Sequence, residues 1–251
     1  MTERDHLLAA VLGDPADDGA RLVLADLLRD GDDPDAQARG RFLWAGVTAS
    51  RFRYHDVIED PLYYAAQNEI AAVAAAGFPA RWAAGVGVGP RTLAAGDWLW
   101  DNAHDRVTVR VGAAVVTFTR GMAAELAVTL AEWLALAPAA LAAWPVERVR
   151  DADVPGLVFA IDPPDSARGG WRLAARLRVP RRNVPLSGPR VVPTTVSPLP
   201  VLEERAEWRA EESFPDRGEL AAGAAAACAA LAADLREAAG DRWPPAPRAR
   251  R

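Results

Sequence analysis

The densest group of side chains able to do chemistry is the segment Asp101-Asn102-Ala103-His104-Asp105. Two carboxylates and an imidazole this close together could supply metal ligands, or a general acid and a general base. Asp and Asn are also the residues that loops favour. The spacing fits neither a calcium-binding loop nor a zinc-binding His-Glu-x-x-His helix. We therefore interpret the segment as a loop and keep a hydrolase or metal site at residues 101–105 as an alternative.

The other reactive side chains form no catalytic pattern. His6 lies on the polar side of a predicted helix and His55 in a predicted loop, so we interpret both as surface residues. Cys228 lies in an alanine-rich run, and we expect it to be a small buried apolar residue. The glycines between residues 85 and 89 lack the Lys-Ser/Thr that follows a phosphate-binding loop. We expect no catalytic residue, no cofactor and no metal site.

All 29 basic residues are arginine, and the chain carries a formal net charge of -5. Residues 168–190 nevertheless hold seven arginines and no acid. The candidate interaction residues among them are Arg172, Arg176, Arg178, Arg181 and Arg182. The first three alternate with apolar residues, so we place them on one side of a strand. They could bind nucleic-acid phosphates, but we favour solvation or pairing within the chain, whose first 40 residues are acidic.

Nine tryptophans are a high number for 251 residues. Trp98 and Trp100 are two apart, so they share a face if this segment is extended. Core packing is the commoner role for such residues, but Trp is also enriched in the centres of protein interfaces. We therefore add Trp98 and Trp100 to the arginines as a candidate interaction surface.

The spacing of apolar residues predicts an α+β fold. Caps and periodicity predict four helices in residues 1–80, which we interpret as a small helical domain. Residues 81–240 are predicted to form a mixed α/β body with antiparallel strands, followed by a disordered Pro/Arg tail at residues 241–251. The predicted strands of the body are 107–111, 115–119, 123–128, 146–149, 157–161 and 171–179. Its predicted helices are 130–144, 201–213 and 218–239, and the glycine-rich segment 85–90 is predicted to be a loop.

The N-terminal segment carries a recognisable pattern: Asp5-His6-Leu7-Leu8, Asp14-Pro15, Arg21-Leu22-Val23-Leu24-Ala25-Asp26-Leu27-Leu28, and Gly40-Arg41-Phe42-Leu43. Residues 4–48 resemble the repeat-companion domain, a planctomycete-type module found beside leucine-rich-like repeats. The chain has Leu27 where the family usually has an aromatic residue, and Arg41 where it usually has an acid. Residues 120–149 resemble the single strand-helix-strand unit that often follows this module. The resemblance implies a binding or scaffold role and implies no catalytic residue.

Composition places the chain among globular proteins, because 51% hydrophobic residues can bury a core. A single cysteine excludes an intramolecular disulfide. The acidic opening residues predict no signal peptide, and acids interrupt the most apolar window, so we expect a cytoplasmic protein without membrane partners. The sequence thus predicts a non-enzymatic protein-protein interaction or scaffold protein. A nucleic-acid-associated protein using residues 168–190 is the alternative, and the sequence gives neither the partner nor the oligomeric state.

Overall fold

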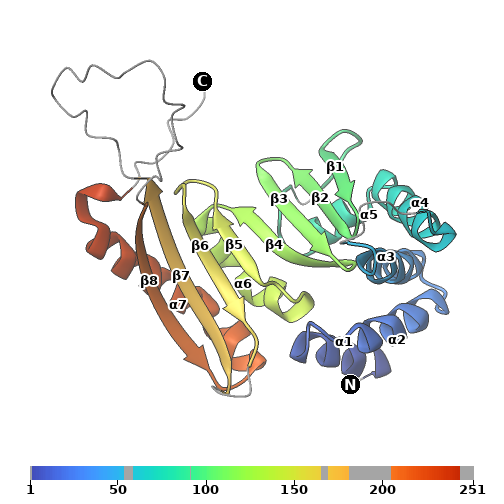
Figure 1. The fold of residues 1–251 in the computed structure, drawn as a ribbon, viewed down its shortest axis with the longest axis horizontal. Helices are drawn as coiled ribbons and strands as arrows, with labels where there is room; N and C mark the ends of the chain where they lie inside the picture. Colours follow the sequence, from blue (N-terminus) through green and yellow to red (C-terminus); the bar gives the residue numbers. More distant parts are fainter. Residues whose placement is uncertain (1, 54–58, 91, 165–168, 181–204, 244–251) are drawn as a thin grey trace, which may run out of the picture.

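The computed structural model describes residues 2–53, 59–90, 92–164, 169–180 and 205–243 (Figure 1). The fold class is α+β, as predicted, with an N-terminal helical region followed by a strand-rich body. The predicted tail at 241–251 overlaps the short 3₁₀ helix η1 (Gly240–Arg242), and residues 244–251 lie outside the described residues.

The N-terminal region consists of α1 (Glu3–Gly13), α2 (Asp18–Arg29), α3 (Pro34–Ser50), α4 (Pro61–Ala75) and α5 (Phe78–Gly85). Side-chain caps start the first four of these helices. Thr2 and Asp5 form a capping box on α1, and aspartates cap α2, α3 and α4. Helix α5 was not predicted. It begins after Gly77, whose positive φ of 78° turns the chain directly into another helix.

The body contains one eight-stranded sheet whose strands follow one another in chain order. The strands are β1 (Trp98–Ala103), β2 (Arg106–Val111), β3 (Ala114–Thr119), β4 (Met122–Val128), β5 (Arg148–Asp151), β6 (Leu157–Asp162), β7 (Trp171–Pro180) and β8 (Arg205–Phe214). Neighbouring strands are antiparallel except β4 and β5, which are parallel because helix α6 (Leu130–Ala143) connects them as a crossover. Helix α7 (Arg217–Ala239) follows β8.

The turn between β3 and β4 fixes the N-terminal helices to the sheet. Arg120 and Gly121 both have positive φ, as a two-residue hairpin turn of this twist requires. Gly46 of α3 lies directly on this turn: a Cβ at Gly46 would be 2.3 Å from the Gly121 nitrogen. Helix and turn therefore touch backbone to backbone, which only glycine permits.

The helices cover one face of the sheet, and the described part of the other face is open (Figure 1). One buried cluster runs from α3–α5 across the inner face of the strands to α6 and α7. Phe118 of β3 stacks edge-on against Phe42 of α3, 5.6 Å away, and against Trp144 after α6, 6.2 Å away. Along the strands the outer positions alternate with buried ones, so every second side chain faces the open side.

Two local predictions were wrong. The charged segment expected as a helix at 201–213 is strand β8 from Arg205 onward, because it pairs along its whole length with β7. Residues 101–103, expected in a loop, form the end of β1 and pair with β2. The β1–β2 connection is only the two residues His104 and Asp105.

Candidate functional site: an arginine-lined sheet face

The residues of the 101–105 segment hold the β1–β2 hairpin against the helices. Asp105 is 1% exposed and forms a two-point ion pair with Arg53, with Nε to Oδ1 at 3.0 Å. The Nδ1 atom of His104 lies 3.0 Å from the Tyr63 hydroxyl oxygen. The His104 carbonyl accepts a hydrogen bond from Gln67 at 2.8 Å. These contacts fasten the hairpin to the end of α3 and to α4.

The two carboxylates of this segment do not converge. Asp101 is exposed on the open face of β1, whereas Asp105 is buried under the hairpin. Within the part of the chain that the structure describes, no group of three or more His, Cys, Asp or Glu side chains could hold a metal ion.

Trp98 and Trp100 share a face of β1, and it is the helix-covered face. The Trp98 ring lies so close to Gly77 that a Cβ there would be 2.4 Å from it. The candidate arginines of β7 lie on the opposite, open face. Tryptophans and arginines therefore form two separate surfaces, since β-strand side chains alternate between the faces.

Arg172, Arg176 and Arg178 lie on the open face of β7, whereas Arg181 and Arg182 lie outside the described residues. Arg172 forms an ion pair with Asp162 of β6 at 2.6 Å. Arg178 forms one with Glu207 of β8 at 3.3 Å. The acidic partners thus come from the neighbouring strands.

In the described residues, an acid of the N-terminal region pairs with an arginine of the β3–β4 turn and not with the arginines of β7. Asp18 at the start of α2 forms an ion pair with Arg120 in the β3–β4 turn, at 3.2 Å. This contact helps to hold the N-terminal helices on the sheet.

The open face carries five further arginines that the sequence analysis did not select: Arg106, Arg110, Arg148, Arg150 and Arg209. They come from β2, β5 and β8, so only the sheet brings them onto the same face as the arginines of β7. For Arg148 and Arg150 the available signal was the pattern Arg-x-Arg, which begins in the predicted strand 146–149 and occurs again at residues 176–178.

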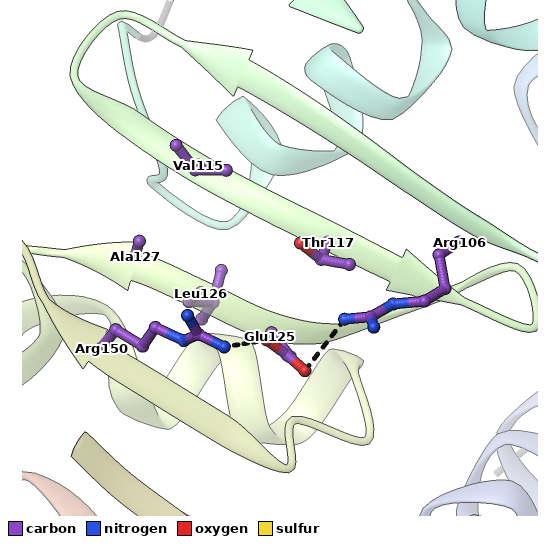
Figure 2. A pocket seen from close by; sticks show the side chains of 7 residues that line it. All are labelled: Arg106, Val115, Thr117, Glu125, Leu126, Ala127 and Arg150. Carbon is purple, nitrogen blue, oxygen red and sulfur yellow. Dashed lines mark hydrogen bonds and ion pairs between the residues drawn. The ribbon is translucent and has the colours of Figure 1, made fainter. Parts of the chain in front are cut away.

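One carboxylate organises the arginines at the centre of the sheet. Oε1 of Glu125 on β4 forms ion pairs with Arg106 at 3.2 Å and with Arg148 at 3.3 Å. Its Oε2 forms a third ion pair, with Arg150 at 3.3 Å. Figure 2 shows Arg106 and Arg150 approaching Glu125 from opposite sides, beside a cavity of about 220 Å³. Three guanidinium groups share one carboxylate, which leaves an excess of two positive charges.

A larger cavity of about 540 Å³ lies over β5, β6 and β7. We call it the arginine trough. Its walls are Arg148 and Arg150 of β5 and Arg176 and Arg178 of β7, and its floor is Val158 of β6 and Gly156, which precedes β6. Val158 pairs with Arg150 on one side and with Arg176 on the other. Because β5 and β7 are two strand spacings apart, the roots of these arginines are about 9.5 Å apart.

The glycine just before β6 has a structural reason. Gly156 has a positive φ of 90°, and a Cβ there would lie 2.0 Å from the Arg178 carbonyl oxygen. Its own carbonyl accepts a hydrogen bond from the Arg178 amide. A larger residue at this position would push β7 away from β6. Because the residue is glycine, the strands stay together and the floor of the trough lies below its arginine walls.

Arg176 is the trough arginine with unused hydrogen-bonding capacity. It forms no ion pair with a described residue, and its Nε is buried without a hydrogen-bond partner. The acid that lines the trough, Asp151, uses Oδ1 to accept the backbone N–H groups of Asp153 at 2.7 Å and Val154 at 2.9 Å. Asp151 Oδ2 is likewise buried without a hydrogen-bond partner and forms no ion pair with Arg176, so no described residue uses the exposed donors of Arg176, which are open to an external anion.

Arg21 and Arg217 have structural roles. Burial lowers the pKa of both Arg21 and Arg217 to about 10. Arg21 donates to the Pro15 carbonyl at 2.8 Å. Arg217 donates to the Trp144 carbonyl at the end of α6, at 2.7 Å, and stacks 4.6 Å from the Trp171 ring.

Cys228 is buried, as expected, on the inner face of α7. Burial raises the pKa of its thiol to about 12, and the Trp133 indole N–H donates to Sγ at 3.2 Å. Among the described helices, α7 alone is long and apolar enough to cross a membrane by length and composition. Its inner side packs against β7, β8 and α6.

Comparison with known protein families gives no match. Comparisons with curated proteins and with solved structures give none either. The resemblance of residues 4–48 to the repeat-companion domain therefore stays a prediction, and the case for function depends on the open face of the sheet.

Proposed function

We propose that this chain is a non-enzymatic, cytoplasmic protein-interaction or scaffold protein. In this proposal the open face of the sheet docks on an acidic segment of a protein partner. The observation that carries the proposal is the arginine trough, where four arginines line one cavity and Arg176 pairs with no carboxylate of the described residues. Arginine suits this role because its planar fork binds carboxylates with two parallel hydrogen bonds.

The composition of the open face favours a protein partner over nucleic acid. At its described positions the face carries no aromatic side chain on which bases could stack. Four carboxylates, from Glu125, Asp162, Glu207 and Glu211, are interspersed among the arginines and would repel a continuous phosphate backbone.

The test measures binding of a fluorescently labelled peptide that alternates Glu or Asp with Leu, by fluorescence anisotropy. A matched peptide has Gln and Asn in place of the acids. We expect the acidic peptide to bind, the amide peptide to bind at least about tenfold more weakly, and the affinity of the acidic peptide to fall with salt.

Variants locate the site. The double variant Arg150→Gln, Arg176→Gln removes one arginine from each wall of the trough and is expected to weaken acidic-peptide binding at least about tenfold. Arg110→Gln removes an exposed arginine of the same face outside the trough and is the matched control. Equal binding of the acidic and amide peptides would contradict the proposal. Tight binding of single-stranded RNA with no binding of the acidic peptide would replace it with the nucleic-acid alternative.

A further inference from the structure

We infer that the arginine trough is a binding site for a phosphomonoester dianion. This inference rests on the proposed function and specifies the chemistry of its central contact. Phosphomonoesters occur on phosphorylated side chains and on free small molecules, and the experiments below separate the two sources.

The local charge balance points to an anion with more than one negative charge. Arg106, Arg148 and Arg150 share Glu125, which leaves an excess of two positive charges. Arg178 and Arg209 share Glu207, which leaves an excess of one. Arg176 adds one positive charge and Asp151 below it adds one negative charge. A single carboxylate would leave most of this excess of three uncompensated, whereas a phosphomonoester carries about −1.5 to −2 near neutral pH.

The shape of the trough fits the same group. Arginines rise from both sides of β6, and their roots are about 9.5 Å apart across Val158. A phosphate on this floor can accept hydrogen bonds from both walls at once, because it presents three oxygens in different directions. A carboxylate presents two oxygens in one plane and can pair well with one wall only.

Arg176 is the expected central ligand. It is the trough arginine that no described carboxylate neutralises, so its charge is the one most available to an external anion. Arg148, Arg150 and Arg178 already hold carboxylates and have further N–H donors to contribute.

The test is isothermal titration calorimetry at constant ionic strength with phenyl phosphate, phenyl sulfate and benzoate. These ligands share a ring and differ in charge and in the shape of the anion. We expect phenyl phosphate to bind at least about tenfold more tightly than either monoanion, because an extra charge-assisted hydrogen bond is worth about this factor. Equal affinities for phosphate and sulfate would overturn the inference.

Three variants place the site. Arg176→Gln is expected to weaken phenyl phosphate binding at least about tenfold, and Arg110→Gln to leave it unchanged. Val158→Asp keeps every arginine but puts a carboxylate on the floor of the trough, so it is expected to abolish phenyl phosphate binding. It provides the test of the site if Arg176→Gln fails to fold. Unchanged phenyl phosphate affinity in folded Arg176→Gln or in Val158→Asp would overturn the inference.

Two further titrations identify the source of the phosphate. A peptide containing phosphoserine that binds at least about tenfold more tightly than free phosphoserine assigns the site to a phosphorylated partner protein. Equal affinities assign it to a free phosphorylated small molecule.

Binding of the acidic peptide without preferential binding of phenyl phosphate overturns this inference alone. Binding of phenyl phosphate without the acidic peptide refutes the proposed docking function instead.

Discussion

Gly46→Ala tests how tightly helix α3 is held on the sheet. An alanine Cβ at position 46 would lie 2.3 Å from the Gly121 nitrogen and 2.6 Å from the Arg120 carbonyl carbon. Real Cβ atoms keep at least 3.0 Å, so the helix and the turn must separate by about 0.7 Å. Neither contact atom belongs to a flexible side chain, so the strain cannot relax locally.

The expected effect follows from two opposing terms. Replacing glycine by alanine inside a helix stabilises it by about 1 kcal/mol. Overpacking against a rigid neighbour costs up to about 3 kcal/mol. We therefore expect Gly46→Ala to lower the free energy of unfolding by about 2 kcal/mol, which corresponds to a Tm lower by about 4–8 °C for a chain of this size.

Urea unfolding at 25 °C, followed by tryptophan fluorescence, measures this change. Gly13→Ala is the matched control, because it makes the same substitution in helix α1 where no atom lies within 4 Å of the new Cβ. We expect the control to be unchanged or more stable by up to about 1 kcal/mol. A Gly46→Ala variant as stable as the wild type would refute the close packing of α3 on the turn.

Three further predictions concern other parts of the fold. Asp105→Ala removes the buried carboxylate of the ion pair with Arg53 and should cost about 2–3 kcal/mol in urea unfolding, and a loss below about 0.5 kcal/mol would contradict the structural role of this pair. Burial raises the pKa of the Cys228 thiol to about 12, so Cys228 should not react with Ellman's reagent at pH 8 in the folded protein but should react in urea. Rapid reaction without urea would contradict the burial of Cys228. Thr129→Ala removes the capping box with Glu132 and should cost about 1 kcal/mol by thermal unfolding, with Thr129→Ser retaining most of the stability.

Local sequence signals predicted helices α1–α4, α6 and α7 and the β2–β3 and β3–β4 hairpins, but not α5, β1 or β8. Thr2, Pro61 and Thr129 start helices where capping chemistry places them. The charged segment at 205–214 misled the prediction, because Ala, Glu and Arg favour helices. Its pairing with β7 overrides that preference, and the alternation of Glu207, Arg209 and Glu211 on the open face is visible only once the strand is known.

The arginine trough could not be predicted from one segment. It combines arginines from β5 and β7 on either side of a third strand, and their neighbours depend on sheet order and register. The alternation in β7 did place Arg176 and Arg178 on one face. The two Trp residues of β1 could not be assigned to a face, since alternation does not say which side of a strand the helices cover.

Arginine footprinting tests the central claim most directly. All 29 basic side chains are arginines, so phenylglyoxal, which modifies guanidinium groups, reports on the accessible basic side chains. Peptide mapping by mass spectrometry would compare modification rates with and without the acidic peptide. The docking account predicts slower modification of Arg148, Arg150, Arg176 and Arg178 and an unchanged rate at Arg110. Docking at the trough would be contradicted if the bound peptide slowed modification of Arg110 as much as modification of the trough arginines. It would also be contradicted if the bound peptide left modification of the trough arginines unchanged.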